Sequence, residues 1–361
     1  MKILVITDQF QRGGADRCAS VMCNELFSRG HDLHIIADTI TSKVSYPLDE
    51  RIPIHQIVAT PKSNSKKDIL AKWVNIIKSI RKYSATLKPD AIITIASRMY
   101  LCTLIATRKK YPLFVADHTS FGRKQHPLID LIRYHLYAYA DGISILTKKD
   151  EALLGEKYPQ KRVIYNPLSF PCLSEKSKRK NNILCAGRLE VWKIKGFDTI
   201  INIWAKIASK YPAWILEIAG DGPPDAQKYL EKLISGNVLV GRVHLLGHVS
   251  DMKKLYSETS IFALPSRVEG FPMVLMEAMS QGCACVAFSI GGASDEMMEK
   301  DSGLLIPDDD IEAFSQALET LITYKEKRDL LSENAIRSIS KFSVKTFGDE
   351  WERFLTDRIK K

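Results

Sequence analysis

The sequence lacks the segments that would place a protein across a membrane. No stretch approaches the ~20 apolar residues that a transmembrane helix needs. The apolar start is interrupted by Asp8 before it reaches the length of a signal-peptide core, and no cleavage-like site follows. We therefore expect a cytoplasmic protein that at most rests on a membrane surface.

Clustered cysteines are also missing. The seven cysteines are scattered along the chain, form no CxxC pair and have no neighbouring group of histidines. Zinc sites and redox dithiols need such clusters, so neither is indicated. We expect idle, mostly buried thiols in a reducing compartment.

The dinucleotide-binding fingerprint GxGxxG is a third absence, and it disfavours a nicotinamide-dependent dehydrogenase. The loop after the first predicted strand contains Gly13 and Gly14 instead. Adjacent glycines before a helix let backbone N–H groups approach an anion closely. The same pair is compatible with a purely structural turn.

Positive charge is abundant but unevenly distributed. The 361 residues contain 52 Lys and Arg against 42 Asp and Glu, a formal net charge of +10. Residues 1–180 hold 30 basic and 16 acidic side chains (net +14), whereas residues 181–361 hold 22 and 26 (net −4). We therefore expect the first half to meet an anionic partner.

Short apolar runs alternate with helical periodicities along the whole chain. The runs predicted as strands are 3–7, 33–37, 54–58, 91–95, 113–116, 143–146, 163–165, 183–186, 214–219, 243–245, 261–264, 284–288 and 304–306. Helices are predicted between many of them, for example at 15–29, 69–83, 199–210 and 226–235. The alternation predicts an α/β protein with two doubly wound, Rossmann-like domains.

We expect the domains at residues 1–166 and 183–343. The segment 167–182 is rich in Pro, Ser and Lys and is predicted to be an exposed linker. A final helix at 344–358 has no strand after it and is expected to pack back on the first domain. Two such sheets facing each other would form a deep cleft, and ligands of these sheets bind at the carboxyl ends of the strands.

Loops of the second half carry residues suited to a phosphate-bearing ligand. Arg188 and Lys195 both follow the first strand of this half; Arg offers phosphate a planar fork and Lys a compact charge. Lys193 is an alternative to Lys195, and a solvated basic loop is an alternative to both. The next two strand ends supply further candidates, namely Gly220, Asp221 and Val249.

The segment 265–279 is the most informative. Pro272 suits the first turn of a helix, whose N–H groups at 273–275 would face a ligand. Glu277 lies in the apolar interior of that helix, where an unpartnered carboxylate is costly. Glu269 lies in the loop before it, too far along the chain for a compact dyad. We expect one acid at a reacting sugar and the other at ribose hydroxyls.

Together these motifs resemble the retaining glycosyltransferases of family 4, which have the GT-B fold. The matching residues are Gly13-Gly14-Ala15, Gly187-Arg188-Leu189 with Lys195-Gly196, Ala219-Gly220-Asp221-Gly222, and Glu269 and Glu277 with seven residues between them. The resemblance covers nearly the whole chain and is strongest over 183–307. Bacterial enzymes that extend surface polysaccharides or polyprenyl-diphosphate-linked glycans look most similar.

The resemblance implies a role for each matching residue. Arg188 and Lys195 would bind the donor diphosphate, although the segment between them is longer than the common form. Glu269 and His118, which follows a strand of the first half, would lie at the transferred sugar. Glu277 would hold the ribose. Further substrate contacts are implied for Gly13, Gly14, Gly220, Asp221, Val249, Gly270, Phe271, Pro272, Met273, Val274 and Leu275.

The implied reaction moves a hexosyl or N-acetylhexosaminyl group from a nucleotide sugar, with UDP favoured, to a glycan hydroxyl with retention. The acceptor is expected to carry a lipid diphosphate. A double-displacement glycosidase would need two carboxylates ~5 Å apart, and no second acid is evident. No metal is expected, because the acidic run 308–310 precedes a predicted helix and suits capping.

The region 62–88 is the most basic of the first half. Its cations include Lys66, Lys67, Lys72, Lys78, Arg81 and Lys82, and its apolar residues recur at helical spacing on the other side. We expect either a surface helix packed on its own sheet or a helix beside the acceptor site. In the second case it would touch anionic head groups at the inner face of the plasma membrane, or the acceptor's diphosphate.

Two other functions stay open on the sequence alone. A GT-B-like sugar-nucleotide epimerase or hydrolase would share the donor motifs but would not need a basic first half. A nucleic-acid-binding protein would also be basic, but aromatic residues should then alternate with the charges. Only Trp73 and Tyr83 do so within 62–88, which disfavours nucleic acid as a partner.

Overall fold

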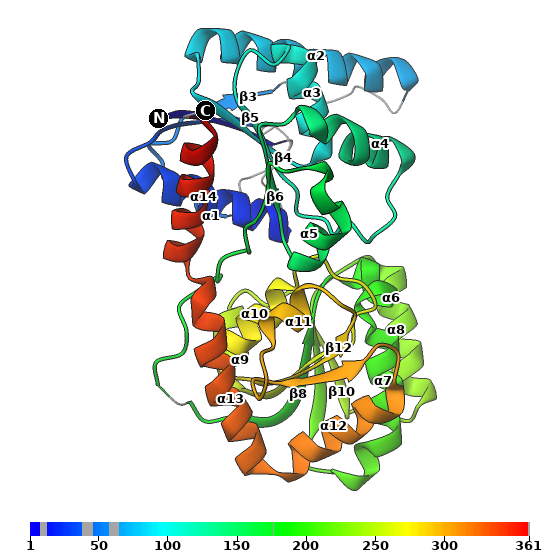
Figure 1. The fold of residues 1–361 in the computed structure, drawn as a ribbon. Helices are drawn as coiled ribbons and strands as arrows, with labels where there is room; N and C mark the ends of the chain where they lie inside the picture. Colours follow the sequence, from blue (N-terminus) through cyan, green and yellow to red (C-terminus); the bar gives the residue numbers. More distant parts are fainter. Residues whose placement is uncertain (8–12, 38–45, 58–64, 176, 360–361) are drawn as a thin grey trace. The chain divides into compact units, whose positions relative to one another are not determined.

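The computed structural model describes residues 1–7, 13–37, 46–57, 65–175 and 177–359, which form two α/β units (Figure 1). The first unit comprises Met1–Pro167 and Ser343–Lys361, and the second comprises Leu168–Phe342. Each unit contains one parallel sheet, of seven strands in the first and six in the second. The predicted fold class, two doubly wound α/β domains, is confirmed.

The sheet of the first unit has the strand order β3-β2-β1-β4-β5-β6-β7, which reverses between β1 and β4. Its strands are β1 (Lys2–Ile6), β2 (Asp32–Ala37), β3 (Ile54–Gln56), β4 (Ala91–Ile95), β5 (Leu113–Ala116), β6 (Gly142–Ile145) and β7 (Lys161–Val163). Along β1, Ile3 and Val5 enter one core cluster, whereas Leu4 and Ile6 enter another. Helices therefore cover both faces, which is why the strand is continuously apolar.

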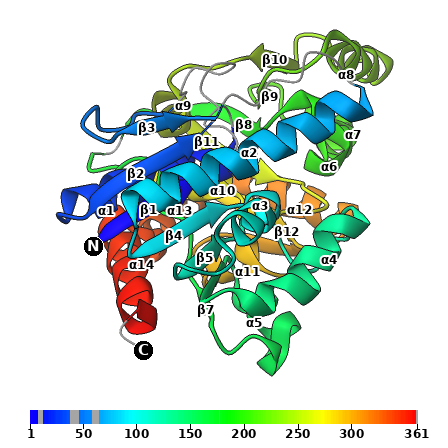
Figure 2. The ribbon, with the colours of Figure 1, turned by 90° about the horizontal axis from the view of Figure 1, so that it is seen from above.

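The helices of the first unit form two layers, one on each face of the sheet. The layer made by α1 (Gly14–Ser28) and α14 (Val344–Ile359) packs on one face. The other layer contains α2 (Lys66–Leu87), α3 (Ser97–Thr107) and α4 (Pro127–His135). The remaining helical segments are η1 (Leu136–Tyr139), α5 (Lys148–Leu154) and η2 (Gly155–Lys157). α2 and α3 lie side by side (Figure 2).

α2 is longer than predicted and packs on its own sheet, as one of the two predicted alternatives had it. It begins three residues earlier because the side chain of Ser65 accepts a hydrogen bond from the Asp68 N–H, a cap that the sequence pattern overlooked. Ile76 is buried, as predicted for the apolar side. Ile69 and Leu70 belong to the same predicted apolar side, but 43% and 65% of their surface is exposed.

The sheet of the second unit has the order β10-β9-β8-β11-β12-β13, which reverses between β8 and β11. Its strands are β8 (Lys180–Ala186), β9 (Ile215–Ala219), β10 (Val243–Gly247), β11 (Thr259–Leu264), β12 (Ala284–Ser289) and β13 (Leu304–Pro307). Its helices are η3 (Leu189–Val191), α6 (Trp192–Lys195), α7 (Phe197–Ile207), η4 (Ala208–Lys210), α8 (Pro224–Gly236), α9 (Met252–Glu258), α10 (Met273–Ser280), α11 (Ala293–Met297), α12 (Ile311–Thr323), α13 (Lys325–Ile339) and η5 (Ser340–Phe342).

The segment predicted as an exposed linker, 167–182, is instead packed on the second unit. Leu168 is buried, and the Leu173 N–H donates to the Ser280 carbonyl at 2.8 Å. The guanidinium of Arg179 donates to three backbone carbonyls of this unit. The prediction of an exposed linker, which rested on the Pro, Ser and Lys content of the segment, is therefore wrong. Lys180 already belongs to β8.

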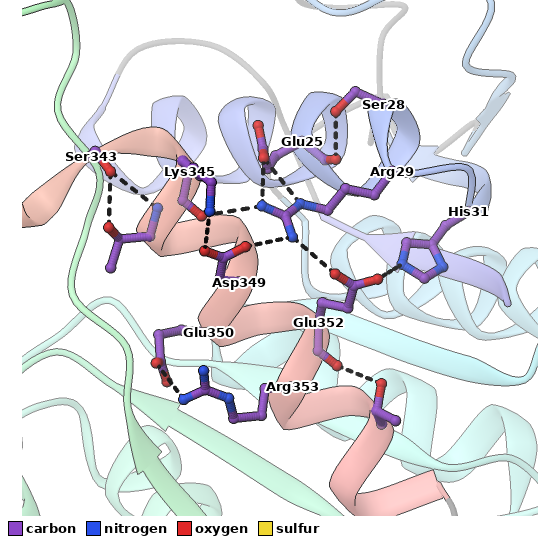
Figure 3. A network of polar contacts seen from close by, with 12 residues as sticks. Glu25, Ser28, Arg29, His31, Ser343, Lys345, Asp349, Glu350, Glu352 and Arg353 are labelled. Carbon is purple, nitrogen blue, oxygen red and sulfur yellow. Dashed lines mark hydrogen bonds and ion pairs between the residues drawn. The ribbon is translucent and has the colours of Figure 1, made fainter.

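The C-terminal helix α14 is held on α1 by a polar network centred on Arg29 (Figure 3). Its guanidinium bonds Glu25 of α1 and both Asp349 and Glu352 of α14, at 2.8–2.9 Å. Burial lowers the pKa of Arg29. The hydrogen bonds to the three carboxylates raise this pKa by a larger amount, so the net shift is upward. The last helix thus belongs to the first unit although α13 belongs to the second.

Two local predictions are confirmed. All seven cysteines are free thiols, six of them buried, and burial raises the pKa of Cys102 to about 11. Asp310 caps α12, because its side chain accepts a hydrogen bond from the Ala313 N–H at 2.9 Å. Within the described ranges, no helix combines the length and hydropathy that a membrane span requires.

Candidate functional site

The predicted donor-binding residues of the second unit gather where its strand order reverses. The segment between β8 and α7 carries Arg188 and Lys195, the last residue of α6, and the loop after β11 carries Glu269. Parallel strands end at the same edge of a sheet, and ligands of doubly wound sheets bind there, beside the reversal. Lys195 and Glu269, which are 74 positions apart in the sequence, therefore lie next to each other.

Lys195 and Glu269 form an ion pair, with Lys195 Nζ 2.8 Å from Glu269 Oε1. Their side chains are 20% and 11% exposed, so the pair is largely withdrawn from solvent but still reachable. An ammonium group has three donors, and one carboxylate oxygen uses only one of them. Lys195 Nζ therefore has donors left for a further acceptor. Lys193, the alternative to Lys195, is exposed.

Two glycines shape the turn that presents Lys195. Gly196 has a φ of +69°, and a Cβ there would lie 1.9 Å from the Pro265 carbonyl oxygen. A Cβ on Gly187 would lie 3.3 Å from three carbons of the Lys195 side chain. Any larger residue would thus displace either the β11 loop or the lysine.

Arg267 ties the same turn to the β11 loop, a role that the sequence did not reveal. Its guanidinium makes a bidentate pair with Asp198, at 2.9 and 3.1 Å, and donates to Thr199 Oγ1 at 2.7 Å. It also bonds the Lys193 carbonyl, while its backbone N–H donates to the Ile194 carbonyl at 2.9 Å. The planar fork of arginine suits this set of acceptors, which a lysine cannot bridge.

α10 carries the second predicted acid. Glu277 is 5% exposed and accepts a hydrogen bond from the hydroxyl of Ser169, so the carboxylate has the partner that its burial requires. The predicted helix start needs correction. Pro272 precedes α10 as its N-cap, because its ψ of 89° is not helical, and Met273 is the first helical residue.

The backbone N–H groups that the first turn of α10 can offer a phosphate are not all of the ones that the resemblance implied. The Leu275 N–H donates to the Pro272 carbonyl at 3.0 Å, so it is not available to a phosphate. The N–H groups of Met273 and Val274 precede any intrahelical acceptor and stay suited to an anion. Gly270 is half-buried, and Phe271 is buried with its ring 6.0 Å from that of Phe342.

The turns after β8, β9 and β10 are hydrogen-bonded to one another. The N–H groups of Gly187, Leu189 and Gly220 donate to the carbonyls of Ala219, Asp221 and Gly247, each at 2.9 Å. A Cβ on Gly220 would lie 1.8 Å from the Gly187 carbonyl oxygen, so this crossing requires glycine. The glycine-rich turns therefore form one continuous rim.

The remaining predicted residues of this rim are more accessible. The side chain of Arg188 is 62% exposed and pairs with Glu190 at 3.0 Å. Asp221 is exposed and Val249 is half-buried. An exposed ion pair contributes little to stability, so Arg188 can exchange Glu190 for a ligand at low cost.

In the first unit, His118 follows β5 next to a buried ion pair. Asp117 accepts hydrogen bonds from Arg133 Nε and the Tyr137 hydroxyl, both at 2.9 Å, and from the Thr119 N–H at 3.0 Å. These hydrogen bonds hold the loop that carries His118 in place. Burial lowers the pKa of the His118 imidazole, although the charge of Asp117 opposes the shift. The imidazole is therefore neutral at pH 7.

Gly13 and Gly14 lie at the start of α1. Gly13 is the N-cap, with an extended backbone, and its N–H donates to the Tyr46 hydroxyl at 3.2 Å. Among the described residues, no atom lies within 4 Å of a Cβ placed on Gly13. Asp8, which the sequence places before this loop, lies outside the described residues.

The predicted basic surface lies on α2. Lys66 is its first residue; Lys67, Lys78, Arg81 and Lys82 are exposed, and Lys72 is half-buried. Ile69, Leu70 and Val74 are exposed on the same helix. α2 thus presents apolar and cationic side chains to solvent together.

Comparison with known proteins identifies the family of the chain. The family model "Glycosyltransferase Family 4" matches residues 12–169, and the model "Glycosyl transferases group 1" matches residues 180–324. Together they span most of both units. The chain belongs to the glycosyltransferases, with a family 4 first domain and a group 1 second domain.

Two bacterial relatives align over almost the whole chain. An uncharacterized glycosyltransferase of Haemophilus influenzae is 28% identical and aligns over 95% of this chain and 96% of its own. A Campylobacter jejuni protein is 24% identical over 99% of both chains; its name describes an α-1,4-N-acetyl-D-galactosaminyltransferase acting on a GalNAc-containing glycan of diNAcBac-PP-undecaprenol. Anabaena HepE, solved with UDP and glucose, superposes with a TM-score of 0.80 at 19% identity, covering 99% of this chain and 100% of HepE. This likeness shows the GT-B fold.

Proposed function

We propose that the protein is a retaining, metal-independent glycosyltransferase that uses a UDP-sugar as donor. The observation that carries the proposal is the Lys195–Glu269 ion pair at the strand reversal of the second sheet. It brings a cation for a departing diphosphate together with a carboxylate for sugar hydroxyls. The presence of UDP in HepE supports the choice of nucleotide.

In this proposal the second unit binds the donor. Lys195 and Arg188 neutralise the diphosphate, and the N–H groups of Met273 and Val274 add donors at the positive end of α10. Glu277 accepts hydrogen bonds from the ribose. These fixed charges stabilise the leaving diphosphate where its charge develops, which is the main catalytic contribution.

His118 acts on the sugar from the first unit. A neutral imidazole both donates and accepts one hydrogen bond, which suits a sugar hydroxyl. Its surroundings do not have to rearrange, because the Asp117–Arg133 pair already holds the loop.

The acceptor proposed here is a hydroxyl of a glycan attached to a lipid diphosphate, in bacterial surface-polysaccharide or glycan synthesis. The name of the Campylobacter relative supports this class of acceptor. The exposed cations and apolar residues of α2 support contact with the inner, anionic face of the plasma membrane.

The anomeric configuration of the product tests the stereochemical proposal. Proton NMR of the reaction with an α-linked UDP-sugar should show an α-linked product. A β-linked product contradicts retention, and release of free sugar without transfer indicates a hydrolase. Activity should persist in EDTA; its loss, with recovery on adding a divalent ion, contradicts metal independence.

Vesicle sedimentation tests the membrane contact. The protein should sediment with vesicles containing phosphatidylglycerol, and the Lys67→Gln, Lys72→Gln, Lys78→Gln triple variant should bind them more weakly, since each cation near the surface contributes about 1 kcal/mol. Binding that is unaffected by the substitutions and by salt contradicts the contact.

A further inference from the structure

A separate basic cavity lies between α2 and α3 of the first unit. It has a volume of about 300 Å³. Its lining includes Arg81 and Ser84 of α2 and Thr107, Arg108 and Lys110 at the end of α3. Both helices end at the amino edge of the sheet, whereas His118 and Gly13 follow the carboxyl ends of its strands. The cavity is therefore distinct from the predicted sugar site.

Ser84 is the unusual residue in the lining of this cavity. Ser84 is 1% exposed, and its Oγ has no hydrogen-bond partner among the residues that the structure describes. A helical serine commonly donates to the carbonyl four residues earlier, as Thr107 does to Thr103 at 2.8 Å. A buried polar group without a partner is costly, so a ligand that accepts this hydrogen bond would stabilise the site.

The charged side chains that line the cavity are all cationic. Within the described part of the chain, no carboxylate lies within ion-pair distance of Arg81, Arg108 or Lys110. Arg81 is held in place because its Nε donates to the Ala106 carbonyl at 3.2 Å. Three cations around one cavity repel each other unless an anion lies between them.

Several carbonyls at the end of α3 already have hydrogen-bond partners. Helix C-termini are negative because their last carbonyls lack partners. Here the N–H groups of Arg108 and Lys110 donate to the carbonyls of Leu104 and Thr107, at 3.0 and 3.1 Å. Arg108 and Lys109 adopt left-handed φ values of 49° and 57°, which turn the chain there.

We propose that this cavity binds a phosphate group. Its oxygens would accept hydrogen bonds from Ser84 Oγ and from the guanidinium groups of Arg81 and Arg108, and Lys110 would add a point charge. A free phosphate and the phosphomonoester head group of a lipid share this chemistry. The site uses none of the proposed donor-binding residues, and it shares Arg81 with the basic surface predicted on α2.

Phosphate binding, measured by calorimetry with inorganic phosphate and by sedimentation with phosphatidic acid vesicles, tests this site. Ser84→Ala removes the donor without changing charge and places a good helix former in α2. It should weaken binding several-fold, and Arg108→Gln with Lys110→Gln should weaken it about tenfold or more. Lys228→Gln, an exposed charge change on α8, is the matched control and should leave binding unchanged.

The two probes identify the source of the ligand. Loss of inorganic phosphate binding in the cavity variants supports the site with a free phosphate as ligand. Loss confined to the vesicles supports it with a lipid head group. Binding of neither probe, or binding that the Ser84→Ala and Arg108→Gln, Lys110→Gln variants leave unchanged, overturns the proposal.

Discussion

At the scale of single residues, the Lys195–Glu269 pair connects the fold to the proposed chemistry. Two loops that follow neighbouring strands hold a cation and a carboxylate 2.8 Å apart, at the edge where ligands of such sheets bind. The sequence motifs predicted both residues. They did not predict that the two bond each other, since this depends on β8 and β11 being adjacent strands.

Removing either member of the pair should nearly abolish sugar transfer. We expect Lys195→Ala and Glu269→Gln each to lower kcat/KM by about a hundredfold or more, the effect of deleting a group that stabilises transition-state charge. Lys193→Ala makes the same charge change two residues away and should retain most activity. Steady-state kinetics with thermal unfolding as a check on folding measures this. If Lys195→Ala kept full turnover, Lys195 would not be the residue that contacts the diphosphate.

Arg267 should act by positioning Lys195. Arg267→Lys keeps the charge but loses the fork that bridges Asp198 and the Lys193 carbonyl. We expect the KM for the donor to rise about tenfold, while kcat changes less. Arg337→Lys, the same substitution on the surface of α13, should change neither constant. Equal constants for Arg267→Lys and wild type would show that the turn does not need the clamp.

At the scale of elements, strand positions were predictable because buried parallel strands are continuously apolar. β4 and β5 match their predicted bounds. β7 lies two residues before its prediction, because this half-buried edge strand contains Lys161 and Arg162. Helix ends were harder to predict, since they depend on caps such as Ser65 and on backbone angles such as those of Pro272.

The hydrogen-bonded turns at the rim should depend on Gly220. A Cβ there collides with the Gly187 carbonyl oxygen, so Gly220→Ala should destabilise the protein by about 2 kcal/mol or more and weaken donor binding. Gly236→Ala, at the end of α8 with nothing within 4 Å, should be neutral or slightly stabilising. Chemical denaturation compares the two. Equal stability of both variants would contradict the close crossing.

At the scale of the whole molecule, the chain returns to its first unit at the end. The sequence indicated that the last helix has no strand to follow it, but not which residues hold it. Arg29 forms ion pairs with carboxylates of both α1 and α14, which lie more than 300 positions apart in the chain. Such a pairing leaves no local pattern, so it could not be predicted from one sequence.

Breaking this network should loosen α14. Arg29→Met leaves Glu25, Asp349 and Glu352 without their shared cation, so amides of 344–359 should exchange hydrogen faster. Arg353→Met is the control, because Arg353 pairs only with Glu350 of its own helix among the described residues. Hydrogen exchange read by mass spectrometry measures both. Equal protection in both variants would show that apolar packing alone holds α14.

The uneven charge of the chain also belongs to this scale. The excess of +14 lies in residues 1–180, while the proposed donor site lies in the second half, with its net charge of −4. In the proposed function, a few placed cations and helix N–H groups bind the highly anionic nucleotide there, rather than bulk charge. The same proposal assigns the basic first half to the acceptor and the membrane.

Nucleotide binding tests the central claim most directly. Calorimetric titration of the wild-type protein and Lys195→Ala with UDP, GDP and ADP separates the diphosphate contact from the choice of base. The account predicts that UDP binds wild type more tightly than GDP or ADP, and that Lys195→Ala loses at least about tenfold in affinity. Undetectable binding of all three, or equal UDP affinity in both proteins, would contradict it.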